Sequence, residues 1–303
     1  MKQTKLSYRL RRSIQSLALK ITSPQIMSKF YYRLFLKKRL DLKHPLGFNE
    51  KIQWLKLYDF PNNDLVIKCT DKYLVREYIK NKGFESILNN MLFVWDDPNE
   101  IDWNLLPNQF AIKCTHGCGY NIICHDKTKI SEKKTKRILK RWMKEKFGNY
   151  NAELHYNKIK PRIICEKYLG KELVDYKFYC FDGVPKFLYI STGLSDWKSA
   201  KVSFYNLDKT LANFGRTDFK AFDDAPFPKH YDEMLKIVNI LAKDFIFVRV
   251  DLYEFEDKIY FGELTFTPAG GLMKIEPVEY EDRFGELLDI TKSNFYKDKG
   301  IKK

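Results

Sequence analysis

The sequence has no hydrophobic run long enough to cross a membrane. No uncharged stretch among its 303 residues reaches the ~18–20 residues that a spanning helix needs. Glycine and proline are also sparse, with 14 and 11 residues and no periodicity, which excludes a collagen-like or fibrous protein. No apolar core precedes a small-residue cleavage site near the N-terminus, so we expect no secretory signal. These absences predict a globular cytoplasmic protein of one large or two small domains.

The six cysteines form no recognisable disulfide or zinc pattern. Most lie in apolar runs such as FAIKC, NIIC and RIIC, where a free cysteine behaves as a small buried hydrophobe. The spacings from Cys114 to Cys118 and from Cys118 to Cys124 differ from the paired spacing of structural zinc sites. We therefore expect a reduced protein without a structural zinc ion.

What the sequence does contain is apolar core material and an excess of positive charge. Hydrophobic residues make up 44% and aromatic residues 16%, which excludes a disordered chain. The formal net charge is +15, and residues 1–43 hold twelve basic residues against the single acid Asp41. Residues 5–20 are amphipathic and basic, which suits an anionic membrane surface, although a helix packed on its own protein has the same pattern. We expect residues 1–25 to dock to a membrane. No nucleic-acid motif is present, and we expect no nucleic-acid partner.

Periodicity and turn residues predict an α+β fold rather than a doubly wound sheet. Asn49 is expected to cap a helix over residues 50–59, and Gly83 to end a second one. Residues 44–100 are predicted to be largely helical. Further helices are expected over residues 131–147 and 232–243, and strands over 110–114, 121–124, 162–168, 176–181, 185–190, 202–207, 247–255 and 258–266.

Two acid-bearing strands form the most informative pattern. Asp251 and Glu263 lie on consecutive apolar strands, so antiparallel pairing would bring their carboxylates together. Arg249 shares a strand face with Asp251, and Thr265 shares one with Glu263. A cation such as Mg²⁺ would neutralise two crowded carboxylates, and it is usually held by one or two carboxylates together with substrate phosphates. An exposed, salt-bridged hairpin is the alternative interpretation.

Two further groups suggest a nucleotide. Lys113 ends an apolar run and precedes the small loop THGCGY, whose backbone N–H groups could hold phosphates, although an ordinary hairpin turn has the same pattern. The loop matches neither GxxxxGK[ST] nor GxGxxG. Residues 162–169 form an apolar strand that ends in Glu-Lys-Tyr-Leu. Such a strand end could contact an adenine edge, while a carboxylate reaches ribose hydroxyls.

The lysine and its loop, the strand that ends in Glu-Lys and the two acid-bearing strands follow one another along the chain. With this order of motifs, the sequence resembles the TupA-like ATP-grasp family of teichuronopeptide and surface-polysaccharide loci. The resemblance covers residues 28–290. It rests on six phrases, FNEKIQWLKLYD, TDKYLVREYI, QFAIKCTHGCGYNIIC, PRIICEKYLG, DYKFYCFDGVPKF and FVRVDLYEFEDKIYFGELTFTPAGG. It implies an ATP-grasp fold, with two α+β lobes that hold ATP and Mg²⁺ between them. The implied organisation is a basic arm (1–43), a helical subdomain (44–100), a small lobe (101–165), a large lobe (166–296) and a basic tail (297–303).

The resemblance also implies roles for individual residues. Lys113 corresponds to the lysine at the nucleotide phosphates, and the loop with His116, Gly117 and Gly119 to the segment that closes over them. Glu166, Lys167 and Leu169 correspond to the segment that contacts adenine and ribose. Lys177 is a basic residue near the phosphates, and Arg249 steadies the acyl phosphate or tetrahedral intermediate. The Mg²⁺ ligands are Asp251, Glu263 and Thr265, where Thr265 replaces an asparagine often found in the superfamily and leaves the number of Mg²⁺ ions open.

The implied reaction is ATP-dependent joining of a carboxylate to an amine. A carboxylate attacks the γ-phosphate, and an amine then displaces phosphate from the acyl phosphate to give an amide. In this family, an acidic sugar or glycan would be the acceptor, and an amino acid or amino sugar the amine donor. A kinase of a glycan hydroxyl would use the same nucleotide half. A glycosyltransferase is a third alternative, but the adjacent acidic pairs lack the Asp-x-Asp spacing.

Overall fold

The computed structural model describes residues 6–171, 173–193, 199–222 and 224–296, without the side chains of Leu6 and Arg9. The expected basic tail lies outside these residues. The α-helices are α1 (Leu6–Ile21), α2 (Pro24–Leu36), α3 (Phe48–Trp54), α4 (Asp64–Thr70), α5 (Val75–Asn81), α6 (Glu132–Lys144), α7 (Tyr231–Leu241) and α8 (Glu279–Glu286). A π-helical turn, Leu55–Asp59, continues α3. Within the described residues, no helix is both long and apolar enough to span a bilayer.

The strands form two main antiparallel sheets and one small one. They are β1 (Met91–Trp95), β2 (Phe110–Cys114), β3 (Asn121–Cys124), β4 (Ile163–Lys167), β5 (Asp175–Phe181), β6 (Val184–Thr192), β7 (Lys201–Asn206), β8 (Gly215–Arg216), β9 (Phe247–Phe255), β10 (Lys258–Thr265) and β11 (Ile275–Glu276). The first sheet has the order β1-β4-β2-β3, the second β10-β9-β5-β6-β7, and β11 pairs with β8. Helices are segregated around antiparallel sheets, which confirms the predicted α+β class.

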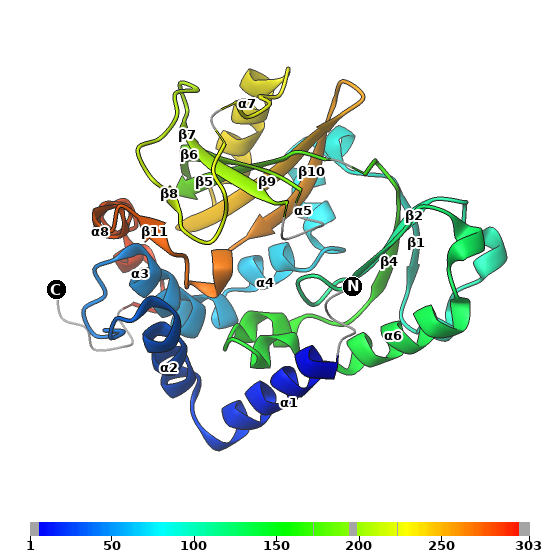
Figure 1. Ribbon diagram of the computed structural model, residues 1–303, viewed down its shortest axis with the longest axis horizontal. Coiled ribbons are helices and arrows are strands. Elements are labelled where there is room, and N and C mark those ends of the chain that lie inside the picture. The colour runs from blue at the N-terminus through cyan, green and yellow to red at the C-terminus, as the bar shows by residue number, and fades with distance from the viewer. Residues whose placement is uncertain (1–5, 172, 194–198, 223, 297–303) are drawn as a thin grey trace.

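The two larger sheets belong to two lobes that face each other (Figure 1). Each lobe has its own apolar core. In the smaller lobe, Trp142 of α6 packs with Tyr120 and Phe110 against the four-stranded sheet. In the larger lobe, Phe48 of α3 lies among aromatic rings such as Phe247 and Phe284. The two clusters of buried residues are separate, so the chain folds around two cores rather than one.

Most predicted elements are confirmed within a few residues, and three expectations need correction. Residues 44–100 are largely helical as predicted, but Met91–Trp95 is a strand that pairs with β4. The expected lobe boundary at residues 165–166 falls inside β4. Asn49 does not cap a helix, because the cap position is Gly47 and Asn49 is buried one residue inside α3. Its amide instead donates to the carbonyl oxygen of Met273, a contact between distant segments that local pattern could not reveal.

Candidate functional site

A cavity of about 860 Å³ lies between the two larger sheets. Its walls come from β2 and β4 on one side and from β5, β9 and β10 on the other. Ile164 and Leu264 supply apolar surface, one from each wall. The volume falls within the range of ligand-binding clefts, and a mainly apolar lining with a few convergent charges is typical of them.

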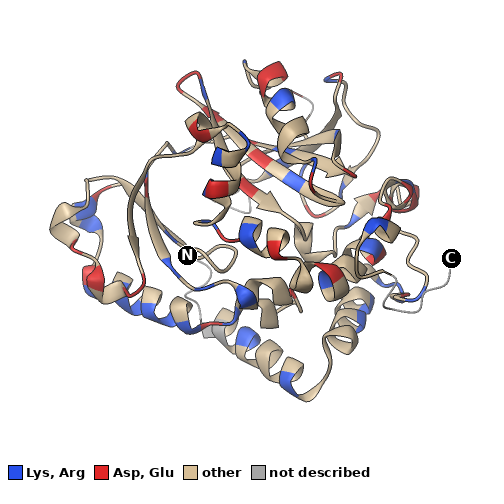
Figure 2. Ribbon diagram, turned by 180° about the vertical axis from the view of Figure 1, so that it is seen from behind, with Lys and Arg blue, Asp and Glu red and all other residues tan. Residues whose placement is uncertain are grey.

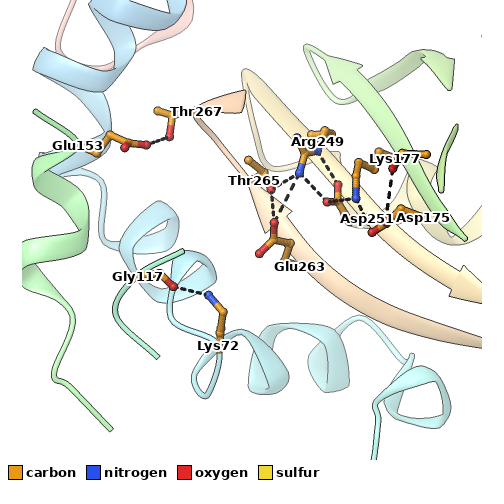
Figure 3. A network of polar contacts seen from close by, with 11 residues as sticks. Lys72, Gly117, Glu153, Asp175, Lys177, Arg249, Asp251, Glu263, Thr265 and Thr267 are labelled. Carbon is orange, nitrogen blue, oxygen red and sulfur yellow. Dashed lines mark hydrogen bonds and ion pairs between the residues drawn. The ribbon is translucent and has the colours of Figure 1, made fainter. Parts of the chain in front are cut away.

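The large-lobe wall carries a compact charge network (Figure 3). The guanidinium of Arg249 binds both carboxylate oxygens of Asp251, with Nε 2.7 Å from Oδ1 and Nη2 2.6 Å from Oδ2. The strand register places Glu263 opposite Asp251, because a bulge at Gly262 shifts the pairing by one residue. The predicted pairing of the two carboxylates is therefore confirmed.

Threonine and lysine side chains complete this network. Thr265 Oγ1 donates to Glu263 Oε1 at 3.0 Å and accepts from Arg249 Nη2 at 3.0 Å. Lys177 Nζ lies 2.5 Å from Asp175 Oδ1 and 3.4 Å from Asp251 Oδ2. Three carboxylates against two cations leave one net negative charge in the cluster. That charge faces the cavity at Glu263, whose side chain is 40% exposed, whereas the side chain of Asp251 is 2% exposed.

The pKa values of the two carboxyl groups are shifted in opposite directions. Burial raises the pKa of Asp251, although Arg249 and Lys177 counteract this effect. Desolvation in the cleft opposes ionisation of Glu263, but the charges of Lys72, Arg249 and Lys177 outweigh it and hold the Glu263 pKa below its usual value. Glu263 is therefore the carboxylate that is both ionised and accessible.

The residue types in this cluster fit a magnesium ion. Two carboxylates and a hydroxyl are hard oxygen donors, and Mg²⁺ needs few protein ligands when phosphates supply the rest. In the described part of the chain, no group of three or more His, Cys, Asp or Glu side chains could hold a metal alone. Arg249 binds both oxygens of Asp251 at 2.6–2.7 Å but lies 3.5 Å from one oxygen of Glu263, so Glu263 is the less tightly paired carboxylate and the better placed to accept a cation.

The small-lobe wall and the neighbouring helix α5 carry the opposite charge. Lys113 of β2 places its Nζ 2.7 Å from Glu166 Oε2, and Arg76 of α5 places Nη1 3.6 Å from Glu166 Oε1. Lys167 and Leu169 also line the cavity, as the sequence predicts for a nucleotide-contacting segment. Asn89 donates to the Lys167 carbonyl at 2.9 Å and fixes the end of this strand. A cationic wall opposite an anionic cluster suits a polyphosphate bridged by a divalent cation.

Lys72, to which the sequence analysis gave no role, holds the loop between β2 and β3. Lys72 Nζ donates to the Gly117 carbonyl oxygen at 2.8 Å (Figure 3). Gly117 has no room for a side chain, since a Cβ there would lie 2.6 Å from the ring of Tyr120. Gly119 lines the cavity, but His116 does not. His116 is buried against α6, with Nε2 3.0 Å from the Trp142 carbonyl, and burial lowers its pKa.

Arg76 and Asp175 are further cavity residues that sequence reasoning missed. Lys72 and Arg76 lie in the phrase TDKYLVREYI, which carried the family resemblance without an assigned role. Their amphipathic helical context gave no sign that they face a cavity. Only the packing of α4 and α5 between the two sheets reveals it.

The turn after β10 is built from strained backbone held by α3. Ala269, Gly270 and Gly271 have φ values of 51°, 67° and 72°. Gln53 donates to the carbonyl oxygens of Gly270 and Gly271 at 3.0 and 2.8 Å. Glu153, from the small-lobe side, accepts from Thr267 Oγ1 at 2.5 Å (Figure 3). The turn next to the carboxylate cluster is therefore held by α3 and by the segment that follows α6.

A family model described as TupA-like ATPgrasp matches residues 50–289. No curated protein sequence matches the chain. Among solved structures, D-alanine–D-alanine ligase from Helicobacter pylori is 16% identical, with a TM-score of 0.41 over 80% of this chain and 66% of that one.

Two other solved structures are similarly distant. The D-alanine–D-alanine ligase from Bacillus anthracis complexed with ATP is 12% identical, with a TM-score of 0.40, and 74% of this chain matches 60% of that one. Phosphoribosylamine–glycine ligase from Thermotoga maritima is 11% identical, with a TM-score of 0.40, and 73% of this chain matches 50% of that one. The chain thus spans about three fifths or less of these two enzymes. Since the family model covers most of the sequence, the chain belongs to the TupA-like ATP-grasp family.

Proposed function

We propose that this protein is an ATP-dependent ligase that joins a carboxylate to an amine through an acyl phosphate. The observation that carries the proposal is the cavity with opposed walls. Lys113, Arg76 and Lys72 contribute positive charge from one side, and the Asp251–Glu263 cluster contributes oxygen donors from the other. Phosphoryl transfer depends mainly on positioning and charge neutralisation, and both walls supply these.

Each residue has a specific task in this proposal. Lys113 and the loop backbone at Gly119 hold the triphosphate, and the strand end at Glu166–Leu169 holds the base and ribose. Glu263, Asp251 and Thr265 would hold Mg²⁺, which would neutralise phosphate charge when bound. Arg249 orients Asp251 and stands beside the site where negative charge develops. Lys177 lines the cavity between Asp175 and Asp251 and balances the charge of these two carboxylates.

We propose a uronic acid of a surface polysaccharide as the carboxylate, and an amino acid or amino sugar as the amine. The family resemblance supports this substrate class. The protein would act in the cytoplasm, beside the inner membrane face where lipid-linked glycans are assembled.

The test is to incubate the protein with ATP, Mg²⁺ and a panel of uronic acids and amines, and to identify products by mass spectrometry. A ligase releases ADP and yields a condensed product that has lost water. A product that gains phosphate without condensation would indicate a kinase and overturn the ligase proposal. Thermal stabilisation by UDP-sugars but not by ATP would instead indicate a glycosyltransferase.

A further inference from the structure

The positive charge of the chain is concentrated in two segments that are distant in sequence. Residues 1–43 carry a net charge of +11. Residues 127–146 hold ten lysines and arginines against Glu132 and Glu145, a net charge of +8. The two segments together exceed the total of +15, so the rest of the chain is net negative. The sequence predicts the basic arm and a basic helix over residues 131–147, but not that the two lie together.

The fold brings these two basic segments together along one edge of the molecule. Arg12 of α1 donates to Tyr120 Oη at 2.9 Å and lies 3.0 Å from Glu145 Oε2, directly after α6. Asn149 donates to Ser16 Oγ at 3.2 Å. In both Figure 1 and Figure 2, α6, α1 and α2 follow one another along this edge. We call these three helices the basic edge.

Helix α1 contacts the body through one face and presents an apolar face to solvent. Arg12 is 8% exposed, and its guanidinium also lies 4.3 Å from the ring centroid of Tyr150. At 100° per residue, Arg12 and Ser16 share one side of the helix. The opposite side holds four large apolar residues that are 59–77% exposed, namely Leu10, Ile14, Leu17 and Ile21. The helix is therefore anchored to its own protein, yet its apolar face remains uncovered.

Helix α2 continues the exposed apolar surface. Met27, Ser28 and Tyr32 are buried toward the body. The outer side holds Ile26, Phe30 and Leu34, which are 57%, 61% and 45% exposed. Exposed lysines and arginines border these residues, among them Lys29, Arg33, Lys37 and Lys38. An apolar strip bordered by basic side chains is the pattern of a helix that lies in a membrane interface.

Helix α6 adds positive charge without a matching set of acids. Its buried side consists of Ile138, Leu139 and Trp142. Lys133, Lys134, Arg137, Lys140 and Lys144 are exposed on the outer side, and among the described residues no carboxylate forms a recorded ion pair with any of them. Charges that are not balanced within the protein are available to an external anion.

We propose that the basic edge docks onto an anionic lipid bilayer, with the apolar side chains of α1 and α2 entering the interface and the lysines of α6 contacting lipid headgroups. Charge complementarity favours this occupant, because each lysine or arginine near an anionic leaflet contributes to binding. A second copy of the chain would bring the same positive edge against itself. A nucleic acid would pair with the lysines but offer nothing to the four aliphatic residues of α1.

This inference deepens the proposed function by specifying the surface beside which the ligase works, but its test does not depend on ligase activity. Full-length protein is mixed with vesicles of phosphatidylcholine alone, or of phosphatidylcholine and phosphatidylglycerol in equal amounts, and bound protein is measured by flotation. We expect binding to the anionic vesicles only, and weaker binding at high salt.

Three variants separate the contributions of the α6 lysines, the apolar face of α1 and total charge to vesicle binding. The triple change Lys133→Glu, Lys134→Glu and Lys140→Glu should weaken partitioning at least about tenfold. The double change Ile14→Ser and Leu17→Ser should also weaken it, without changing net charge. The matched control, Lys236→Glu, Lys243→Glu and Lys258→Glu, has the same charge change on exposed residues around α7 and the β9–β10 turn, and should bind as wild type does.

Several outcomes would overturn the proposal. Equal binding to both vesicle types would show that anionic lipid is not recognised. Equal losses in the α6 triple variant and the control would show that only total charge matters. A dimer in sedimentation that Ile14→Ser and Leu17→Ser dissociates would assign the apolar face to a second copy. Retained ATP binding and an unchanged melting temperature confirm that each variant is folded.

Discussion

The Nζ of Lys113 lies 2.7 Å from Oε2 of Glu166, joining the residue expected at the phosphates to the residue expected at the base and ribose. The pair links β2 to β4 across the small-lobe sheet. We expect Lys113→Ala to lower ATP affinity by roughly ten- to a hundredfold, the effect of losing one charge-assisted contact. Isothermal titration calorimetry with ATP and Mg²⁺ measures this affinity. Lys236→Ala, on the exposed side of α7, is the control and should bind normally. If Lys113→Ala bound ATP as tightly as wild type does, Lys113 would not be an ATP-binding residue.

Asp251 should matter for stability as well as for turnover. It is buried with Arg249 and Lys177 as partners, so Asp251→Asn removes the bidentate carboxylate of Arg249 and leaves Lys177 with Asp175 alone. We expect the free energy of unfolding to fall by about 3–5 kcal/mol, measured by urea denaturation. A variant as stable as wild type would show that the two cations find other partners.

Glu263 offers the contrasting case. Its side chain is 40% exposed, so Glu263→Gln should change stability by less than about 1 kcal/mol. ATP turnover should nevertheless be lost, because the accessible carboxylate of the cluster is neutralised. ADP release at increasing Mg²⁺ concentration checks this prediction. Normal turnover at every concentration would exclude Glu263 as a Mg²⁺ ligand.

The turn at residues 267–271 should be sensitive to added side chains. Gly271→Ala would place a Cβ 2.9 Å from Gln53 Nε2 in a residue with a φ of 72°. Gly83→Ala is the matched control, since Gly83 has a φ of 86° and no atom within 4 Å of the added Cβ. The control should lose about 1–2 kcal/mol of stability from backbone strain alone. Gly271→Ala should lose more, and it should also lower ATP turnover. Equal losses would show that the contact with Gln53 adapts freely.

The carboxyl group of Glu281 predicts a pH dependence. Burial raises its pKa to about 7, well above the usual value for a glutamate, although Asn49 donates to both of its oxygens. The folded protein therefore holds this proton more tightly than the unfolded chain does. Folding stability should fall as pH rises from about 4.5 to about 7, by roughly 3 kcal/mol from this group.

Glu281→Gln tests the assignment of this pH dependence. The variant lacks the titrating group, so its free energy of unfolding should rise relative to that of wild type across the same pH range. Denaturation curves at several pH values give the difference. A constant difference would show that Glu281 is not the titrating group.

The strands around the site could be predicted because their side chains alternate. The sequence of residues 247–266 predicts both β9 and β10, and with them the approach of Asp251 to Glu263. The bulge at Gly262, which sets the actual register, has no local signal beyond the glycine itself. Lys113 and Glu166 were identified separately, and their contact depends on the pairing of β2 with β4.

Contacts between distant helices were not predictable from local pattern. Asparagine is a common helix-capping residue, but the partners of Asn49 are Met273 and Glu281, more than 200 positions away in sequence. Lys72 and Arg76 line the cavity because α4 and α5 pack between the sheets, which the local sequence does not show. The basic helix over residues 131–147 was expected, yet its position beside α1 depends on the buried contacts of Arg12.

The hydrogen bonds of Asn89 and Asn90 to Lys167 have a topological consequence. Lys167 N donates to the Asn90 carbonyl oxygen, and Asn89 donates back to Lys167. The chain therefore enters and leaves the four-stranded lobe through two segments that are bonded side by side. The four-stranded sheet is joined to the rest of the chain at this paired stem, and Lys72 and Thr267 add contacts at Gly117 and Glu153. A tilt of this lobe would therefore act on the strand end beside Leu169, the segment that we propose contacts the nucleobase.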